Sequence, residues 1–478
     1  MTFGAILKFT AVFIVSILAI YGFKRLICLI FSKNNLVTNS ILLIITISGL
    51  IFGYIGITHC SSVLTVKDST QLIIWEGSGN INEELINVNR IKQSDLITKN
   101  LYLVKSLSIE NGQFNNWKLR QNELIEQYEN KVALSHNSPD KINIVVVIGE
   151  SFIKSHSSIY GYYLPTSPKL EKELSNNLLV KFNDIITSAN FTSQSLSNLF
   201  NLNDVSDSEK WTESIFWPIL FKFANFDVNF YSNQINIRHN YLPTSGMLYH
   251  HPLFVDKLYS HVNDTTMTYD GDFIDHYANF SQENNRSLTF WHLMGQHFAA
   301  KDRYPSKDDA YTKISIDQIK CDKPWITSSH KQQICDYANA TIYNDSIVST
   351  IINFYRESPT ILVYFSDHGE EIWDIAPYGV RNNPQPEDPD WIKRQFDIPF
   401  FVWMSRPFRE AYPEIVAKVE AAKDRPGMLD NLGQMLLGVA GIQTEYYRSD
   451  RDILSDDYVA RPRVTEAGYE YDRIVNSD

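Results

Sequence analysis

Residues 361–371 read ILVYFSDHGEE, an apolar run that stops at Ser366, Asp367 and His368. A continuous apolar run of this length predicts a strand that is buried on both faces of a sheet. Four other runs also end in polar residues: INIVVVIGES (142–151), FDVNFYSNQ (226–234), LTFWHLMGQH (288–297) and IPFFVWMS (398–405). Helical stretches separate them, so the sequence predicts an α/β domain with a mostly parallel central sheet and helices on both faces.

Polar residues at the ends of these runs form a candidate site. In open α/β sheets the site lies beyond the carboxyl ends of the strands, so Glu150, His297, Asp367 and His368 are expected at one edge of the sheet. Two carboxylates and an imidazole suit zinc or manganese as ligands. The alternative is that acidic residues at strand ends only cap the helices that follow.

The N-terminal part contains two long apolar runs, residues 3–23 and 41–57. Each is about long enough to cross a hydrocarbon core of roughly 30 Å. The alternative is a signal peptide followed by a buried helix. Lys24, Arg25 and Lys33 lie between the runs and predict a cytoplasmic loop, which places the rest of the chain outside the cytoplasm.

We therefore expect three parts: a membrane anchor with two transmembrane helices (1–61), a polar, partly helical connector (62–139) and a catalytic domain (140–478). Hydrophobic residues make up 44% of the chain, enough for a large core. The net charge of −12 gives no basic surface for nucleic acid.

Two of the four cysteines, Cys321 and Cys335, flank a polar loop. In an oxidising compartment they could form a disulfide that closes this loop, and we expect that pairing. Two unrelated free thiols are the alternative.

The sequence also resembles a known family. The block IGESFIKSHSSIYGYYLPTSPKL (148–170) is similar to the opening motif of the phosphoethanolamine transferases, which are membrane-anchored members of the sulfatase and alkaline phosphatase superfamily. Further blocks follow in the family's order, among them SANFTSQSLSNLF, FYSNQ, WHLMGQHFAAKDRYP, CDYANATIYND, YFSDHGEE and IPFFVWMS. The resemblance covers most of residues 142–405.

The resemblance implies a metal-bound threonine as nucleophile, which in this chain is Thr192. It implies Zn²⁺, with Mn²⁺ as the weaker candidate, bound by Glu150, Thr192, Asp367 and His368. A threonine hydroxyl needs such activation, because it is a poor nucleophile at neutral pH. Nearby hydroxyls leave alternatives for the nucleophile: Thr187, Ser188, Ser193 and Ser195.

By the same resemblance His297 and His292 line the substrate site and protonate a leaving oxygen or hold the phosphoryl group. His292 could equally be a core histidine.

Positive side chains near the motifs are candidates for binding phosphate. Lys154 and His156 follow Glu150, although a solvated loop would explain them equally well. Many relatives have another histidine after the DHG motif, and this chain has none. Arg381, Lys393 and Arg394 could supply charge there instead, and a second metal ion remains open.

The resemblance implies that the protein lies in a bacterial inner membrane with its catalytic domain in the periplasm. It would move phosphoethanolamine from phosphatidylethanolamine, through a phospho-threonine-type intermediate, to lipid A or a core sugar of lipopolysaccharide. A phosphoglycerol transferase is the nearest alternative enzyme, and an inactive membrane sensor is the alternative of another class. The formylglycine motif C/S-x-P-S-R of sulfate ester hydrolases does not occur.

Overall fold

A computed structural model describes residues 112, 114–127, 141–235, 252–278, 286–308, 310–377, 379–380 and 388–476. All of them belong to one compact unit, Glu110–Asp478. The predicted spans at 3–23 and 41–57 lie outside the described residues. Within the described residues, no helix has the length and the apolar content that a membrane crossing requires.

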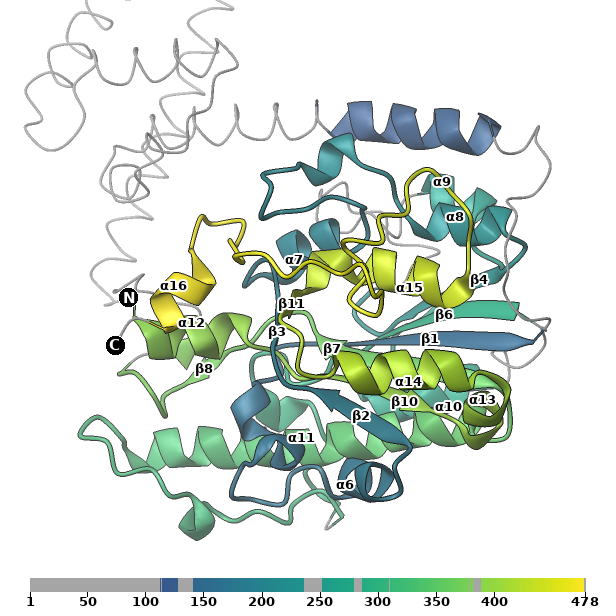
Figure 1. Cartoon of the computed structure of the whole chain (residues 1–478). Coiled ribbons are helices and arrows are strands. Elements are labelled where there is room, and N and C mark those ends of the chain that lie inside the picture. The colour runs from purple at the N-terminus through teal and green to yellow at the C-terminus, as the bar shows by residue number, and fades with distance from the viewer. Residues whose placement is uncertain are drawn as a thin grey trace, which may run out of the picture. The chain divides into compact units, whose positions relative to one another are not determined.

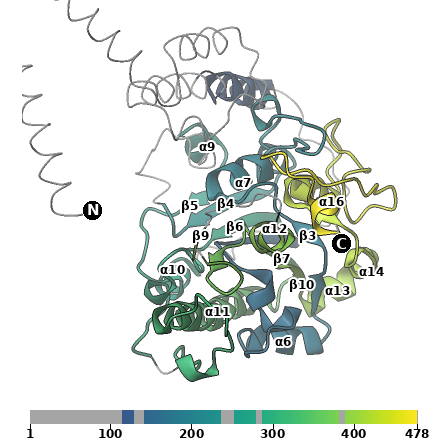
Figure 2. The ribbon, with the colours of Figure 1, turned by 90° about the vertical axis from the view of Figure 1, so that its left-hand side faces the viewer.

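A seven-stranded sheet forms the centre of this unit, with the strand order β2-β10-β7-β1-β6-β4-β5 (Figures 1 and 2). Its strands are β1 (Ile142–Gly149), β2 (Leu179–Phe182), β4 (Asp227–Ser232), β5 (His261–Val262), β6 (Arg286–His292), β7 (Thr360–Ser366) and β10 (Phe400–Met404). β1 is parallel to β6 and β7, and β4 is parallel to β5 and β6, whereas β10 is antiparallel to both neighbours. The predicted mostly parallel α/β sheet is confirmed.

Helices cover both faces of the sheet (Figures 1 and 2). One face packs on α7 (Thr192–Leu199), α8 (Pro218–Phe223), α9 (Pro252–Lys257), α14 (Pro413–Ala422) and α15 (Leu432–Ala440). The other face packs on α6 (Pro168–Ser175), α10 (Asp270–Tyr277) and the long α11 (Ser328–Tyr355). The remaining α-helices are α12 (Pro389–Phe396), α13 (Arg406–Ala411) and α16 (Tyr471–Val475). Two small ribbons pair β3 (Ile185–Ile186) with β11 (Gly427–Met428), and β8 (Glu371–Ile372) with β9 (Gly379–Val380).

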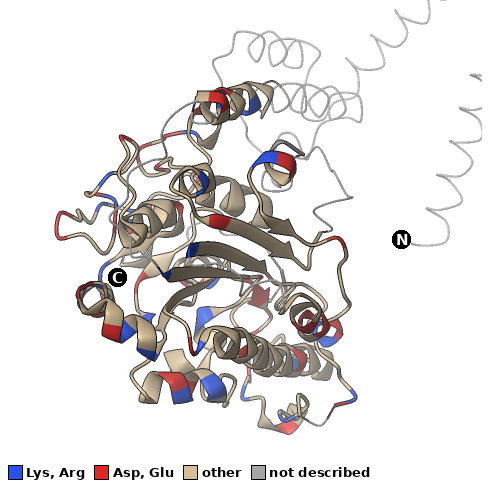
Figure 3. Ribbon diagram, turned by 90° about the vertical axis from the view of Figure 1, so that its right-hand side faces the viewer, with Lys and Arg blue, Asp and Glu red and all other residues tan. Residues whose placement is uncertain are grey.

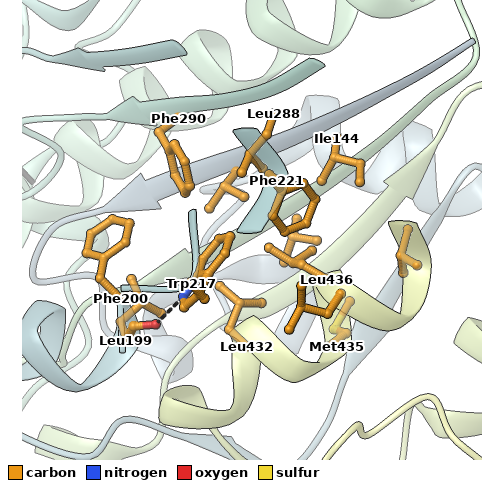
Figure 4. Packing of buried hydrophobic residues seen from close by; sticks show 14 of the residues in the cluster. Ile144, Leu199, Phe200, Trp217, Phe221, Leu288, Phe290, Leu432, Met435 and Leu436 are labelled. Atoms are coloured by element: carbon orange, nitrogen blue, oxygen red, sulfur yellow. Dashed lines mark hydrogen bonds between the residues drawn. The ribbon is translucent and has the colours of Figure 1, made fainter. Parts of the chain in front are cut away.

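Strand β1 shows why the apolar runs do not alternate with polar residues. Ile144 and Val146 belong to the core under α7 and α15, whereas Val145 and Val147 belong to the core under α11. Successive side chains point to opposite faces, and here both faces are buried. Figure 4 shows the first core, where Trp217 packs among aliphatic and aromatic side chains and donates from Nε1 to the Leu199 carbonyl at 2.8 Å. Charged residues lie mainly on the surrounding helices and loops (Figure 3).

Part of the predicted connector packs on this core. Residues 114–127 are helical, in agreement with the predicted helix in this region. Trp117 is fully buried against Phe216 and Phe254, and its Nε1 donates to Asn201 Oδ1 at 2.8 Å. This helix is therefore a structural part of the unit that starts at Glu110.

Candidate metal centre and active site

Neighbouring strands bring two carboxylates and an imidazole together. β1 and β7 are paired with Gly149 opposite Ser366, so Glu150 and Asp367 leave the sheet at the same level. Ligand atoms of Glu150, Asp367 and His368 lie within 4.8 Å of one another, and all three side chains are fully buried. The predicted grouping of these three residues at one edge of the sheet is present in the structure.

Thr192 completes the cluster from a third element. It is the first residue of α7, and its hydroxyl donates to Glu150 Oε2 at 3.1 Å. The same oxygen lies 3.2 Å from His368 Nε2. Thr192 is half-buried, whereas the other three residues of the cluster are fully buried.

Backbone contacts orient the two residues that follow β7. The amides of Ser151 and His368 donate to Asp367 Oδ1 at 3.0 and 2.8 Å. His368 Nδ1 lies 2.7 Å from the Gly369 carbonyl, which can only accept, so Nδ1 carries the proton. Nε2 is therefore the ring nitrogen that faces Glu150 and Asp367, at 3.4 and 3.3 Å, where it could ligate a metal.

The other hydroxyls near Thr192 have different partners. Thr187 and Ser195 both donate to the Asp367 carbonyl at 2.7 Å, and their oxygens lie 2.9 Å apart. Their hydroxyls hold the main chain of the DHG loop in place. Geometry therefore favours Thr192 over these two alternatives as the residue that faces the cluster.

Gln234 is a site residue that the sequence reasoning missed. Its side-chain amide donates to Glu150 Oε2 at 2.9 Å, the same oxygen that accepts from Thr192. The available signal was its position directly after the apolar run FDVNFYSN, which is the position that Glu150 and Asp367 occupy after their own runs.

The electrostatics of the cluster fit a divalent cation. Burial, and then the charge of Glu150, raise the pKa of Asp367 to about 7. Burial also acts to raise the pKa of Glu150, but the hydrogen bond and charge of His368 outweigh it and hold that pKa well below its usual range. Asp367 Oδ2 is buried without a hydrogen-bond partner and faces the cluster 3.3 Å from His368 Nε2. A cation would satisfy this oxygen and offset the buried negative charge.

The two predicted substrate histidines differ in their surroundings. His297 is half-buried and directly follows Gln296, whose backbone amide donates to the Glu150 carbonyl at 3.0 Å. His292 is fully buried at the end of β6, with Nδ1 at 3.2 Å from Ser232 Oγ. Burial lowers its pKa to about 4. These contacts support the core alternative for His292.

Three predicted phosphate-binding residues have acidic partners. Lys154 pairs with Asp397 at 2.7 Å. His156 lies 2.7 Å from Asp374, and Arg394 pairs with the same carboxylate at 3.1 Å. These bonds connect three parts of the chain: the loop after β1, the loop after β7, and helix α12 with the residue that follows it. A substrate role for Lys154, His156 and Arg394 stays a prediction. Arg381 lies outside the described residues.

The predicted disulfide between Cys321 and Cys335 is wrong, because both are buried free thiols. Cys335 Sγ lies 3.2 Å from the Ile314 carbonyl, whereas Cys321 Sγ is directed at the Asp374 carbonyl at 3.9 Å. Each sulfur therefore contacts a different part of the backbone.

Known proteins that are similar to this chain are named phosphoethanolamine transferases, the family that the motifs resemble. This chain is 25% identical over 370 residues to phosphoethanolamine transferase EptC of Escherichia coli K12, and the alignment covers 75% of this chain and 61% of that protein. It is 28% identical over 281 residues to phosphoethanolamine transferase EptA of Helicobacter pylori, and this alignment covers 56% of this chain and 49% of that protein. The chain thus spans about half to three fifths of the length of these two relatives.

Solved structures show the same fold. The zinc complex of the periplasmic domain of E. coli EptC aligns with a TM-score of 0.59 at 23% identity, over 72% of this chain and 96% of that domain. The integral membrane protein EptA of Neisseria meningitidis aligns with a TM-score of 0.54 at 18% identity, over 80% of this chain and 68% of that protein. The sulfatase family model matches residues 142–442, more than half of the chain. The chain therefore belongs to the sulfatase family.

Proposed function

We propose that this protein is a metal-dependent phosphoethanolamine transferase that uses Thr192 as its nucleophile. The observation that carries the proposal is the contact of the Thr192 hydroxyl with both Glu150 and His368, in a buried cluster completed by Asp367. Similarity to proteins named phosphoethanolamine transferase supports the choice of reaction.

Glu150, Thr192, Asp367 and His368 would hold the cation, and zinc is preferred because of the donor set and the zinc complex of the E. coli EptC domain. A bound divalent cation supplies a nucleophile at neutral pH by favouring the deprotonated hydroxyl. The chain itself holds Thr192 at the first position of α7, where free backbone N–H groups favour the negative charge of a phosphoryl group.

In the first step the Thr192 oxygen forms a bond to phosphorus, and the bond from phosphorus to the diacylglycerol oxygen breaks. In this proposal His297 donates a proton to that leaving oxygen. In the second step an acceptor oxygen displaces Thr192 and takes the phosphoethanolamine group. We propose lipopolysaccharide, at a phosphate of lipid A or at a core sugar, as the acceptor, and a periplasmic position for this domain on an inner-membrane anchor.

The decisive experiment incubates the purified chain with phosphatidylethanolamine labelled in its headgroup. A phosphoethanolamine mass increment is expected on the peptide that contains Thr192, and none in the Thr192→Ala variant. A parallel incubation with phosphatidylglycerol tests the alternative donor. A phosphoglycerol group on Thr192 from phosphatidylglycerol, and none from phosphatidylethanolamine, would indicate a phosphoglycerol transferase. A protein that takes no group from either lipid and holds no divalent ion would contradict the proposal and favour an inactive sensor.

A further inference from the structure

A large cavity lies beside the candidate metal centre. Its volume is about 720 Å³, within the range of roughly 300–1,000 Å³ that is usual for ligand sites. Three segments line it: residues 296 and 298–301 after β6, the first turns of α11, and residues 370–373, 377 and 379 around β8 and β9.

Two of these segments also carry residues of the site. Gln296 and Phe298 line the cavity and flank His297, and the backbone N–H of Gln296 donates to the backbone carbonyl of Glu150 at 3.0 Å. Glu370 lines the cavity two residues after His368. A molecule bound in the cavity would therefore approach the cluster from the side of His297.

The lining suits a polyhydroxy compound. Gln332 and Gln333 are exposed on α11. Gln332 Nε2 donates to Asp336 Oδ1 at 2.9 Å and Gln333 Oε1 accepts from Trp373, so Gln332 Oε1 and Gln333 Nε2 are the amide atoms that can bond a ligand. Asp336 adds acceptor oxygens one turn further along the helix. Phe298 is 60% exposed and offers an apolar ring face, which can cover the C–H side of a sugar ring.

The charge of the lining disfavours an anionic ligand. In the described part of the cavity wall, Asp336, Glu370 and Glu371 are carboxylates and Lys301 is the cation. Glu371 lies 3.8 Å from Arg394, and the carboxylates in this described part of the wall outnumber its one cation. A phosphate group would meet like charge here, whereas a neutral hydroxyl would find acceptors.

Trp373 forms a rigid part of the wall. Its φ angle is +78°, a left-handed conformation that bulky residues rarely adopt. Its indole stacks on His330 with 4.1 Å between ring centroids, and Nε1 donates to Gln333 Oε1 at 3.1 Å. Its carbonyl accepts from Trp325 at 2.8 Å. Backbone strain that is held by several contacts is characteristic of ligand-binding sites.

We infer that this cavity binds the acceptor of the transfer, and that the accepting group is a neutral sugar hydroxyl and not a phosphate. The inference rests on the proposed function. In the step that it describes, the acceptor oxygen forms a bond to phosphorus and the bond from phosphorus to Thr192 Oγ1 breaks. The acceptor hydroxyl loses its proton, and the Thr192 oxygen regains one, so the step is balanced.

The test separates the two half-reactions in the full chain, with phosphatidylethanolamine vesicles as donor. The first half-reaction is followed, without acceptor, by diacylglycerol release and by label on Thr192. The second is followed by transfer to a core oligosaccharide without phosphate groups, and in parallel to lipid A that carries phosphates and no core sugars. The test variant combines Phe298→Ala with Gln332→Ala. Leu119→Ala, at a side chain that is 62% exposed on the helix of residues 114–127, is the matched control.

The double variant is expected to raise the KM for the oligosaccharide about ten-fold or more, the loss expected from one hydrogen bond and one ring contact. The first half-reaction and the control variant should stay within about two-fold of the parent, a change of less than about 0.5 kcal/mol. An unchanged oligosaccharide KM, a slower first half-reaction, or transfer to lipid A phosphates alone would each overturn the inference. Absence of label on Thr192 in the parent protein would instead contradict the proposed function.

Discussion

Glu150 shows how single side chains set the geometry of the candidate site. Its Oε2 accepts from both Thr192 and Gln234, and its Oε1 accepts from Ser151 Oγ at 2.8 Å. Three donors therefore fix both carboxylate oxygens before any cation binds. Residues that hold a ligand in this way commonly change metal affinity by about 10–100-fold when they are replaced.

Gln234→Leu is expected to weaken zinc binding by about 10–100-fold, because it removes the amide donor to Glu150. The fold should stay intact, because leucine has a similar size. Competition titration with a zinc chelator measures the affinity, and circular dichroism checks the fold. Gln443→Leu, at an exposed position away from the site, is the control. Equal zinc affinity in the Gln234 variant and the parent would show that this amide does not position Glu150.

At the scale of elements, helices hold one another through buried polar side chains. Asp345 on α11 accepts from the backbone amides of Lys169 and Leu170 at 3.0 and 2.9 Å, at the start of α6. The first amides of a helix have no partner within the helix, so Asp345 acts as a cap supplied by a different element. The loop after β7 is held similarly: the Gly369 amide donates to the Gln395 carbonyl at 2.8 Å, and a Cβ at Gly369 would lie 1.9 Å from the Arg394 carbonyl oxygen.

Asp345 predicts a pH dependence of stability. Burial raises its pKa from 3.8 to about 6, and the two amides only partly oppose this. The folded state therefore binds the proton more tightly than the unfolded state, and the contribution of Asp345 to the free energy of unfolding falls as the pH rises from about 4 to about 6. Two pKa units correspond to about 3 kcal/mol.

Asp345→Asn keeps one acceptor oxygen and cannot ionise. Urea unfolding between pH 4 and pH 7 should show the free energy of unfolding of the parent falling relative to that of the variant as the pH rises, by up to about 3 kcal/mol. Asp302→Asn, at an exposed position, serves as the control for the loss of a surface carboxylate. A parent whose stability relative to Asp345→Asn stays constant or rises with pH would contradict the assigned direction of the shift.

At the scale of the whole molecule, local sequence patterns predicted the sheet and the residues at the strand ends. Both features depend on short segments, because a strand that is buried on both faces is a continuous apolar run and the site residues follow it directly. Thr192 required the family resemblance, because nothing in the segment NFTSQS distinguishes its hydroxyl from the neighbouring ones. Long-range partners were not predictable. Lys154 and His156 meet Asp397 and Asp374, more than 200 residues away, and the two cysteines face separate carbonyls.

The folded unit includes Trp117, and therefore begins before the predicted catalytic domain. Residue 140 was the predicted start of the catalytic domain, whereas the compact unit starts at Glu110 and includes the helix of residues 114–127. A chain that starts at residue 140 would lack Trp117 and expose Phe216 and Phe254, which are fully buried in the structure. Removal of a buried tryptophan side chain costs about 3–5 kcal/mol, a large part of the net stability of a domain.

We therefore expect the fragment 110–478 to unfold in one cooperative transition, and the fragment 140–478 to melt at a lower temperature or to aggregate. In the longer fragment Trp117→Ala should lower the free energy of unfolding by about 3–5 kcal/mol, since it leaves a cavity and removes the indole donor to Asn201. Leu119→Ala, on the exposed side of the same helix, should change the stability little. Calorimetry and urea titration measure both effects. Equal melting temperatures of the two fragments would show that the helix does not stabilise the domain and that folding needs only the sequence from residue 140 onwards.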